Sequence, residues 1–569
     1  MAKTFKDSIT IVISGEAGQG IQTLEMFLLR LLKENGYFIF SYSEFMSRIR
    51  GGNNSTEIRI TSEKRSAYVD TIDIFIPLHI NAYKRLASRI KPDTVILAKK
   101  NEYEHYSCNK CGQNFDFPLS QLVKDAGGKR YENIFILGFI AALFNIEEKE
   151  LHTILNTYFA RKGPEILEKN KMAASFGYHY SEEHFKEKYI TINMKQNNSL
   201  NHMLLFNGST SIGLGAIAGG CNFIASYPMS PGTGVLVYLA DKAEEYEILV
   251  EQAEDEIAAV NMGIAAWYAG ARAMATTSGG GFALMAEGLS LAGITESPMV
   301  IHIGQRPGPG TGLPTRTEQG DLLFAAFAGH GEFPRIIYAP GTFEEGIRLT
   351  QKAFNMADTY QIPVIILTDQ YYLDSYGICE NITPEENTYS VVTTEESYNR
   401  YALDENGISP RGIPSNGTGV VRLDSDEHDE SGFITEDFDM RINMNNKRLK
   451  KQETFKNDTV EPTLIGSEEY KNLIISWGTT RPVVEEALKN VNKPDTAQLH
   501  FSQVYPLPES TLEYINKADK VCIIENNATS QFGKIITMET GIQIEERLLK
   551  YNGMPFSVEE IEEYIGESF

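Results

Sequence analysis

The sequence predicts an α/β protein built from three consecutive α/β domains. Its 569 residues leave room for roughly three or four domains of ordinary size. With 42% apolar and 22% charged residues, each domain can bury an ordinary core. Runs of β-forming residues alternate with helical patterns, and this alternation restarts after polar stretches. The predicted domains are 1–190, 200–378 and 461–569, with an extended connector at 379–460.

The first domain opens as a strand, a glycine turn and a helix. A β-branched run ends at Ser14, three glycines follow within six residues, and apolar residues then recur at helical spacing until Gly36. A polar, Asn-rich stretch at 186–204 is predicted to be a linker. Further β-rich runs alternate with helical patterns and predict a parallel, doubly wound sheet; they are 37–42, 56–60, 72–77 and 94–98.

The second and third domains repeat the alternation. The third domain begins with a strand pattern at 472–476, continues as a helix to Leu488, and has a later strand at 520–525. The connector between them is polar and charge-rich, with little core of its own. In the second domain the predicted elements are a helix at 256–269, a strand at 271–277, a tight turn at 279–281, a helix at 282–292, and strands at 299–303 and 364–368.

Composition and charge exclude several classes of protein. There are 52 Lys and Arg against 76 Asp and Glu, a net charge of −24, so a broad nucleic-acid-binding face is not expected. The first ten residues have no long apolar stretch, so no signal peptide is expected. The longest strongly apolar run, 134–146, is shorter than the roughly 18 residues of a membrane span. Five cysteines, an odd number, argue against a disulfide framework and favour a cytoplasmic protein.

The turn Gly15-x-x-Gly18-x-Gly20 leaves more than one function open. Backbone N–H groups at a helix start can hold a phosphate, so the turn is a candidate anion site. Its spacing is the reverse of the dinucleotide fingerprint, and no acidic residue ends a clear second strand. One interpretation is an NAD(P)-dependent oxidoreductase, and this turn is the only evidence for it. A packing turn, or a site for another phosphorylated ligand, is the alternative.

Two further clusters contain metal-ligand residue types. Cys108 and Cys111, with His105 nearby, have the spacing of one ligand pair of a zinc site. The sequence has no second cysteine pair. The alternative is therefore a surface loop with two free thiols. An iron–sulfur cluster needs four thiolates, and none is expected within this chain. The carboxylates of Asp424–Glu430 around His428 could bind a divalent cation, or could form a solvated charged surface.

The most informative block runs from Ser226 to Leu322. Loops rich in Gly, Pro and Thr lie at strand ends in α/β folds, where ligands bind. Its motifs are Tyr227-Pro-Met-Ser230-Pro, Glu254-Asp-Glu256-Ile-Ala-Ala, Thr-Thr-Ser278-Gly279-Gly-Gly, Gln305-Arg306-Pro-Gly-Pro-Gly and Thr311-Gly-Leu-Pro-Thr-Arg316-Thr-Glu-Gln-Gly-Asp321.

Together these motifs closely resemble the α subunits of 2-oxoacid:ferredoxin oxidoreductases, in the form that carries the γ domain fused at its N-terminus. The resemblance implies a γ-type domain at 1–190, a thiamine-diphosphate-enzyme pyrimidine-binding-like domain at 200–378 and a transketolase C-terminal-like domain at 461–569. It covers nearly the whole chain, because similar motifs occur outside the block: Arg50-Gly-Gly, Asp426-Glu-His-Asp-Glu with Ile434-Thr-Glu436, Ser476-Trp-Gly-Thr and Glu525-Asn-Asn.

The resemblance implies cleavage of a 2-oxoacid on thiamine diphosphate, transfer of the acyl group to coenzyme A, and one-electron transfers to ferredoxin. The chain has no Gly-Asp-Gly…Asn-Asn stretch, the usual magnesium-diphosphate anchor of thiamine enzymes. In the family, Mg²⁺, the diphosphate site and the nearest [4Fe–4S] cluster belong to the β subunit. This chain is therefore expected to be half an active site, inactive alone, in an α2β2 assembly. Gly15, Gly18, Gly20 and Arg50 are the candidate site for coenzyme A.

The resemblance places Glu256 at N1′ of the aminopyrimidine. A helix-opening glutamate beside Ile257 and two alanines suits this role, because an apolar setting raises a carboxyl pKa and lets the group share a proton. The alternative is that Glu254, Asp255 and Glu256 merely favour the helix N-terminus electrostatically.

The same comparison assigns the substrate side of the site. Ser230 stands where the family has threonine and keeps the hydroxyl that hydrogen-bonds the substrate, with Tyr227 in the same loop. Arg306 is a fixed cation that can hold a carboxylate bidentately. Ser278 and Gly279 are expected to contact the cofactor. A non-catalytic scaffold is disfavoured because these groups occur together.

The far end of the substrate is predicted from a second arginine. Arg316 follows Arg306 by ten residues, and two arginines in one pocket would favour a dianionic substrate. The prediction is therefore 2-oxoglutarate, with pyruvate or a branched-chain 2-oxoacid as alternatives. Arg316 could instead pair with Glu318 or Asp321 nearby.

Overall fold

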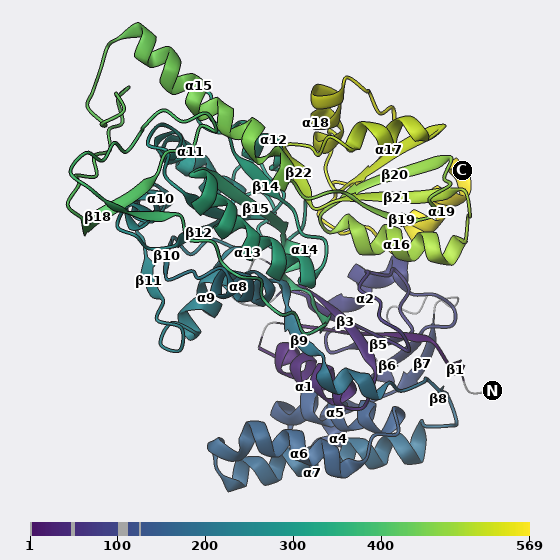
Figure 1. The fold of residues 1–569 in the computed structure, drawn as a ribbon. Coiled ribbons are helices and arrows are strands. Elements are labelled where there is room, and N and C mark those ends of the chain that lie inside the picture. Colours follow the sequence, from purple (N-terminus) through teal and green to yellow (C-terminus); the bar gives the residue numbers. More distant parts are fainter. Residues whose placement is uncertain (1–2, 17, 47–51, 101–111, 125–126) are drawn as a thin grey trace. The chain divides into compact units, whose positions relative to one another are not determined.

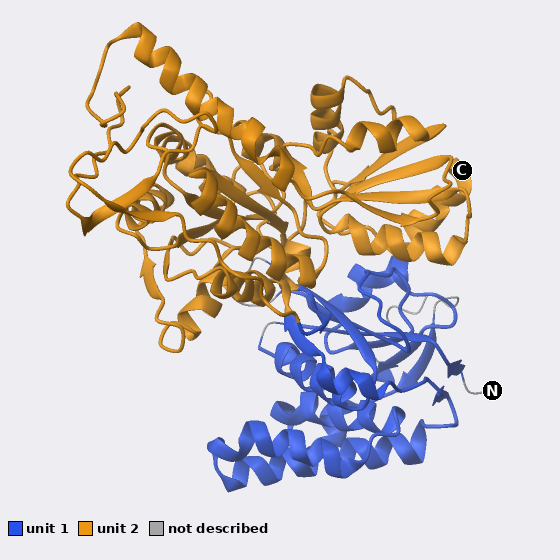
Figure 2. Cartoon of the chain, in the orientation of Figure 1, with its two compact units in different colours: residues 1–206, 375–381 blue, residues 207–374, 382–569 orange. Residues whose placement is uncertain are grey.

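The computed structural model describes residues 3–16, 18–46, 52–100, 112–124 and 127–569. The chain divides into two units, which Figure 2 shows in different colours. Unit 1 is discontinuous in sequence, because a short segment from the middle of the chain completes its sheet. Unit 1 comprises Met1–Phe206 and Ser375–Asn381, and unit 2 comprises Asn207–Asp374 and Ile382–Phe569.

The sheet of unit 1 has the strand order β7-β6-β5-β2-β4-β3-β16-β9. A separate pair, β1 (Lys3–Phe5) and β8 (Ile190–Ile192), joins the start of the chain to the stretch predicted as a linker. The strands of the larger sheet are β2 (Ser8–Gly15), β3 (Phe38–Glu44), β4 (Asn54–Thr61), β5 (Ile74–Pro77), β6 (Val95–Ala98), β7 (Gln113–Asp116), β9 (Leu204–Asn207) and β16 (Tyr376–Cys379).

This sheet is mixed, so the prediction of a parallel sheet in the first domain was wrong in part. Strand β4 runs antiparallel to both β2 and β3, whereas β2, β5, β6 and β7 are parallel. The cause is the connection between β3 and β4. Only residues 45–53 separate these strands, and a parallel crossover needs roughly a dozen residues or more, usually including a helix.

The helices of unit 1 include a buried one, α5 (Glu132–Leu143), which holds most of the apolar run at 134–146. Helix α5 packs against α1 (Ile21–Glu34) and α7 (Pro164–His184), as Figure 1 shows. A Cβ at Gly138 would lie 1.9 Å from the carbonyl oxygen of Ala174, so this contact requires glycine. No helix among the described residues is long and apolar enough to cross a bilayer. The other helices are α2 (Asn81–Leu86), α4 (Leu119–Leu122) and α6 (Glu148–Phe159).

The main sheet of unit 2 has the strand order β11-β10-β12-β13-β15-β14-β22, and all neighbours are parallel except β14 and β22. Its central strands β12, β13 and β15 are buried along their whole length. The strands are β10 (Phe223–Ser226), β11 (Leu249–Gln252), β12 (Ala273–Ser278), β13 (Met299–Gln305), β14 (Ile336–Tyr338), β15 (Pro363–Asp369) and β22 (Gln503–Tyr505). The helices are α8 (Gly208–Ala218), α9 (Thr233–Asp241), α10 (Glu256–Tyr268), α11 (Gly279–Ile294), α12 (Leu322–Phe327), α13 (Phe343–Tyr360) and α14 (Gln370–Asp374).

A second sheet of unit 2, with the order β19-β21-β20-β23-β24, is formed by the C-terminal part of the chain (Figure 1). Strand β22 directly follows β21 of this sheet, but it pairs antiparallel with β14 of the main sheet. Consecutive strands thus belong to the two different sheets of unit 2. The boundary predicted between the second and third domains stays a prediction. The elements are β19 (Thr463–Gly466), β20 (Asn472–Trp477), β21 (Thr496–Phe501), β23 (Lys520–Glu525), β24 (Glu546–Leu549), α16 (Thr480–Val491), α17 (Thr511–Lys517), α18 (Gln531–Thr540) and α19 (Val558–Ser568).

The region predicted as an extended connector contains regular structure that the sequence analysis missed. A parallel pair, β17 (Val391–Thr394) and β18 (Arg411–Gly417), precedes the helix α15 (Phe438–Thr454). Helix α15 is strongly polar, yet Lys447 and Lys451 on it are buried. An ionic contact, and not an apolar face, therefore anchors this helix.

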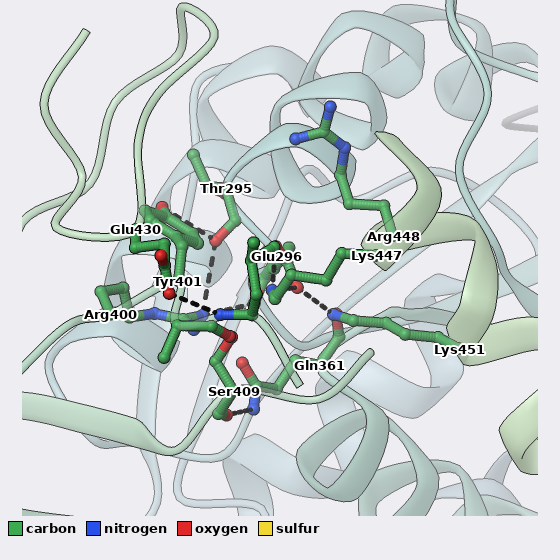
Figure 3. Close-up of polar contacts among 12 residues, drawn as sticks. Thr295, Glu296, Gln361, Arg400, Tyr401, Ser409, Glu430, Lys447, Arg448 and Lys451 are labelled. Carbon is green, nitrogen blue, oxygen red and sulfur yellow. Dashed lines mark hydrogen bonds and ion pairs between the residues drawn. The ribbon is translucent and has the colours of Figure 1, made fainter. Parts of the chain in front are cut away.

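Figure 3 shows that contact, which centres on the buried carboxylate of Glu296, just after α11. The Nζ atoms of Lys447 and Lys451 each lie 2.6 Å from a carboxylate oxygen of Glu296. Arg400 donates from Nη2 to the backbone oxygen of Glu296 at 2.7 Å. Burial lowers the pKa of Lys451 to about 7. The charge of Glu296 acts in the opposite direction, but it does not prevent this shift because one anion here faces several cations.

Candidate active site

Three loops of unit 2 meet at one edge of its main sheet. Strands β10, β12 and β13 are neighbours and parallel, so their carboxyl ends lie at the same edge. The segments that follow them are the loop at 227–232, the start of α11 at Gly279, and the loop from Arg306 to Asp321. The topology thus brings together three of the motifs that the sequence analysis selected as ligand-binding loops.

The three acidic residues at the start of α10 have different environments. Asp255 is the N-cap, and its side chain accepts a hydrogen bond from the backbone N–H of Ala258 at 2.8 Å. Glu254 is exposed. Glu256 is only 2% exposed, and Thr277 Oγ1 donates to its Oε1 at 3.4 Å. Burial raises the pKa of Glu256. Because Asp255 already caps the helix, Glu256 is left as a buried carboxyl group at the edge where the loops meet.

The glycines at the start of α11 make room for two carboxyl groups. A Cβ added at Gly281 would lie 2.2 Å from Oε1 of Glu256, and one added at Gly279 would lie 2.2 Å from Oδ2 of Asp321. Gly280, between them, would meet nothing closer than 3.9 Å. A side chain at the first glycine would displace the carboxyl of Asp321, and one at the third would displace both Thr277 Oγ1 and the carboxyl of Glu256, whereas one at the second would not.

The loop after β10 is tied to its neighbours. Ser278 Oγ donates to the sulfur of Met229 at 2.7 Å, and Arg306 Nη1 donates to the backbone oxygen of Ser230 at 2.7 Å. The side chains of Tyr227 and Ser230 are exposed. The loop thus presents a hydroxyl and a phenol to solvent beside the guanidinium of Arg306.

The two arginines predicted to share a pocket have different surroundings. Arg306 lies beside Ser230, and burial lowers its pKa while the charge of Asp321 opposes this shift. Arg316 lies against the segment from Gly553 to Met554: its Nη1 is 3.8 Å from the Met554 sulfur. The structure therefore brings Arg306 to the backbone of Ser230. Asp321 is tied to the residue before Arg306, because its backbone N–H donates to Gln305 Oε1 at 3.0 Å. Arg316 lies instead against the C-terminal part of unit 2.

Comparison with known proteins decides the family. The chain is 31% identical over 617 residues to the "2-oxoacid:ferredoxin oxidoreductase subunit alpha" of a Sulfolobus species, across 97% of this chain and 95% of that relative. The chain belongs to the α subunits of the 2-oxoacid:ferredoxin oxidoreductases. Two family descriptions match within it: "Pyruvate ferredoxin/flavodoxin oxidoreductase" over residues 10–180, and "Pyruvate flavodoxin/ferredoxin oxidoreductase, thiamine diP-bdg" over residues 214–447.

Other members of the family extend this comparison. A solved structure described as "2-oxoglutarate:ferredoxin oxidoreductase from Magnetococcus marinus with 2-oxoglutarate, coenzyme A and succinyl-CoA bound" is 30% identical, with a TM-score of 0.90 over 99% of this chain and 100% of that one. The "2-oxoglutarate synthase subunit KorA" of Archaeoglobus fulgidus is 31% identical over 364 residues, which are 60% of this chain and 99% of that relative.

In this 2-oxoacid:ferredoxin oxidoreductase α subunit, Gln319 fixes the loop that carries Arg316 and Asp321. Its Nε2 donates to the backbone oxygen of Trp477 at 2.9 Å, and its Oε1 accepts from the backbone N–H of Asn526 at 2.9 Å. No role is predicted for Gln319 from the sequence. Only its place within the Thr311–Asp321 motif pointed to it, because its partners lie at the ends of β20 and β23, far along the chain.

The motif Glu525-Asn-Asn has a structural role close to this contact. Glu525 is fully buried and accepts hydrogen bonds from Trp477 Nε1 at 3.2 Å, Asn527 Nδ2 at 2.7 Å and Ser530 Oγ at 2.8 Å. The carboxylate therefore organises the edge of the C-terminal sheet that holds Gln319.

The remaining candidates lie elsewhere. Cys108, Cys111 and Arg50 fall outside the described residues. In the acidic cluster, Glu427 pairs with Arg441 at 2.5 Å and Arg448 at 2.8 Å. Within the described part of the chain, no group of three or more His, Cys, Asp or Glu could hold a metal ion.

The glycine turn lies in unit 1, between β2 and α1. Gly20 precedes α1 in a left-handed conformation, and no side chain caps this helix. The backbone N–H of Glu16 donates to Gln19 Oε1 at 2.6 Å. A Cβ at Gly18 would meet no atom of the described residues within 4 Å. Among the described residues, the N-terminal end of α1 thus has no side-chain cap, and Gly20 lies beside the side-chain amide of Asn133.

Proposed function

We propose that this chain, together with a β subunit, catalyses the coenzyme A-dependent oxidative decarboxylation of 2-oxoglutarate to succinyl-CoA, with electrons passed to ferredoxin. The observation that carries the proposal is the buried carboxyl group of Glu256 at the edge where three loops meet. It is supported by the full-length similarity to α subunits of this family. We also propose an α2β2 assembly, and a cytoplasmic location because the five cysteines, an odd number, do not form a disulfide framework.

The residues at the start of α10 and α11 fit the aminopyrimidine half of thiamine diphosphate. This half needs a carboxyl group that shares a proton, and Glu256 is a buried carboxyl with a raised pKa. Ser278 and Gly279 stand at the start of α11, where the first backbone N–H groups of a helix have no partner within the helix. When bound, thiamine diphosphate supplies the electron sink that makes loss of CO₂ from a 2-oxoacid possible. We assign Mg²⁺, the diphosphate contacts and the [4Fe–4S] cluster to the β subunit.

On the substrate side, this chain binds and orients. The Arg306 guanidinium holds the carboxylate next to the keto group, because a planar cation with parallel donors matches a carboxylate. The Ser230 hydroxyl hydrogen-bonds the substrate, and Tyr227 lies in the same loop. Arg306 fixes this loop by donating to the backbone oxygen of Ser230, and the Ser230 side chain is exposed. Both groups position the bond to be cleaved.

The choice of 2-oxoglutarate is supported by two relatives. The Magnetococcus marinus structure and the Archaeoglobus fulgidus subunit are both named for 2-oxoglutarate. Within this chain, we propose that Arg316 contacts the distal carboxylate. Arg316 lies in a loop that Gln319 fixes to the C-terminal sheet, so its backbone is held in place. Pyruvate and branched-chain 2-oxoacids, which have no distal charge, are the alternatives.

Replacing Arg316 with Ala should raise KM for 2-oxoglutarate at least about tenfold in the reconstituted α–β complex, because a charge-assisted contact to a carboxylate is lost. KM for 2-oxobutyrate, which lacks the distal carboxylate, should change less than about threefold. The two values come from steady-state kinetics on one preparation, so any damage to folding affects both. Equal changes in both, or a wild-type complex that prefers pyruvate, would rule out this role.

For coenzyme A we propose the glycine turn of unit 1, with Gly15, Gly18, Gly20 and Arg50 as the contacts. The uncapped start of α1 and the open space at Gly18 suit a phosphate group. The Magnetococcus marinus structure contains coenzyme A, which shows that a protein similar along its whole length binds this molecule.

A further inference from the structure

Asp321 carries a carboxyl group that the roles above do not use. It directly precedes α12, where an aspartate commonly caps the helix, yet its side chain makes no capping hydrogen bond. The carboxyl lies over Gly279 instead: an added Cβ there would be 2.2 Å from Oδ2 and 2.3 Å from Oδ1. The start of α11 therefore has two carboxyl groups against it: that of Asp321 at Gly279, and that of Glu256 at Gly281.

The charged groups around Asp321 come from several elements. Arg306, from the loop after β13, is the cation whose charge acts on it, and Glu318, from its own loop, is the neighbouring anion. Glu256 belongs to α10 and lies against Gly281 of α11. The Oδ2 atom of Asp321 is buried and has no hydrogen-bond partner among the described residues.

These surroundings make the ionisation of Asp321 sensitive to a further charge. Burial raises its pKa to about 6, with Arg306 acting in the opposite direction. Burial and the charge of Asp321 raise the pKa of Glu318 to about 6. If the carboxylate of a 2-oxoacid binds to Arg306, a second anion arrives at the cation that Asp321 already faces. Two carboxylates at one cation disfavour each other's charged form, and the 2-oxoacid is the stronger acid, so the proton goes to Asp321.

We propose that Asp321 is a positioning residue that serves as the proton-linked counter-charge of Arg306. Its carboxylate offsets the charge of Arg306 when no substrate is bound. It takes one proton from solvent when the substrate carboxylate binds, and returns that proton to solvent when the carboxylate leaves as CO₂. Arg306 then has an anion nearby before and after cleavage, which avoids an uncompensated cation. This inference rests on the proposed function, because it takes Arg306 as the partner of the substrate carboxylate.

The test measures kcat/KM for 2-oxoglutarate in the α–β complex, with a viologen as electron acceptor, from pH 5.5 to 8. At each pH the value for Asp321→Asn is divided by the value for the wild type. The value of kcat/KM reports groups that titrate in the free enzyme. The ratio of variant to wild type should be near one at pH 5.5, where Asp321 is protonated. It should rise to about ten at pH 8, because a nearby charge shifts a pKa by roughly one unit or more, and this coupling acts equally on substrate affinity.

Two further variants complete the design. Glu318→Gln removes the neighbouring carboxyl, whose pKa the charge of Asp321 raises. Because Glu318 acts on Arg306 only through Asp321, the ratio for this variant should change less than about threefold over this pH range. Asp321→Ser removes the same charge in a smaller side chain and supplies the ratio if Asp321→Asn does not assemble. A ratio that is constant with pH in the Asp321 variants, whether above or below one, would overturn the role of Asp321 alone. A wild-type complex that cleaves no 2-oxoacid at any pH would overturn the proposed function, and this inference with it.

Discussion

Replacing Glu256 with Gln should lower kcat of the reconstituted α–β complex by about 10²–10⁴-fold, the usual size of a lost acid–base contribution. Glutamine has nearly the same shape but cannot share a proton as the buried, raised-pKa carboxyl can. Because Asp255 caps α10, the fold and the assembly should not change. Steady-state assays with matched circular dichroism and gel filtration make the measurement. Turnover above a tenth of the wild-type rate would show that Glu256 is not the activating carboxylate.

A matched pair of glycine variants tests the position of the same carboxyl group. In Gly281→Ala the new Cβ would lie 2.1 Å from Oγ1 of Thr277 and 2.2 Å from Oε1 of Glu256, so the carboxyl and its hydrogen-bond donor must move. The value of kcat should fall by at least about tenfold, because misplacement by about 1 Å is costly. In Gly280→Ala the nearest atoms would be 3.9 Å away, and kcat should stay within about twofold. Equal effects in both variants would mean that the contact with Glu256 does not matter for turnover.

Replacing Glu296 with Gln should lower the free energy of unfolding of unit 2 by about 3–5 kcal/mol, because it leaves buried cations without their anion. Glu296 is 1% exposed. The two lysines of α15 that contact it are also buried: Lys447 is 4% exposed and Lys451 is 1% exposed. Loss of this anion should release α15 first. Thermal unfolding and hydrogen exchange along 438–454 measure both effects.

The controls for this prediction follow from the excess of cations. Lys451→Met removes one cation of the buried cluster, and should cost about 1 kcal/mol or less, since an apolar group replaces a charge that burial already disfavours. Lys450→Met, at an exposed pair with Glu453, should change stability by less than about 0.5 kcal/mol. If Lys451→Met destabilised as much as Glu296→Gln, the cluster would not be cation-rich in solution.

The pH dependence of stability follows from the same cluster. The pKa of Lys451 is about 7 in the folded chain, below its ordinary value of 10.5. Between these pH values the unfolded chain binds more protons, so this group makes stability rise with pH, and the gain is absent below pH 7. Lys451→Met should lack this rise.

The parts of the structure that are local in sequence could be predicted from it. The helix predicted at 256–269 is α10 (Glu256–Tyr268), and the strand predicted at 271–277 is β12 (Ala273–Ser278). Both follow from patterns within a single window of residues. The motifs at strand ends pointed to loops that the structure brings together, because parallel neighbouring strands place their carboxyl ends at one edge.

Contacts between distant residues could not be predicted. The carboxyl of Asp321 lies on Gly279, and Gln319 bonds to Asn526; no local pattern encodes either pairing. Helix α15 was missed because the residues that anchor it are lysines, which sequence patterns assign to solvent. Strand β22 adds to a sheet formed by residues more than a hundred positions earlier, which a division by sequence cannot show.

The measurement that tests the proposed function most directly is the assay of 2-oxoacid-dependent viologen reduction with coenzyme A, for the purified α chain alone, the β subunit alone, and the two together. Each is given thiamine diphosphate and Mg²⁺, and 2-oxoglutarate, pyruvate and a branched-chain 2-oxoacid are compared. If the active site is shared, neither chain alone should turn over, and the mixture should act best on 2-oxoglutarate. Turnover by the α chain alone, or a reconstituted complex without activity on any 2-oxoacid, would contradict it.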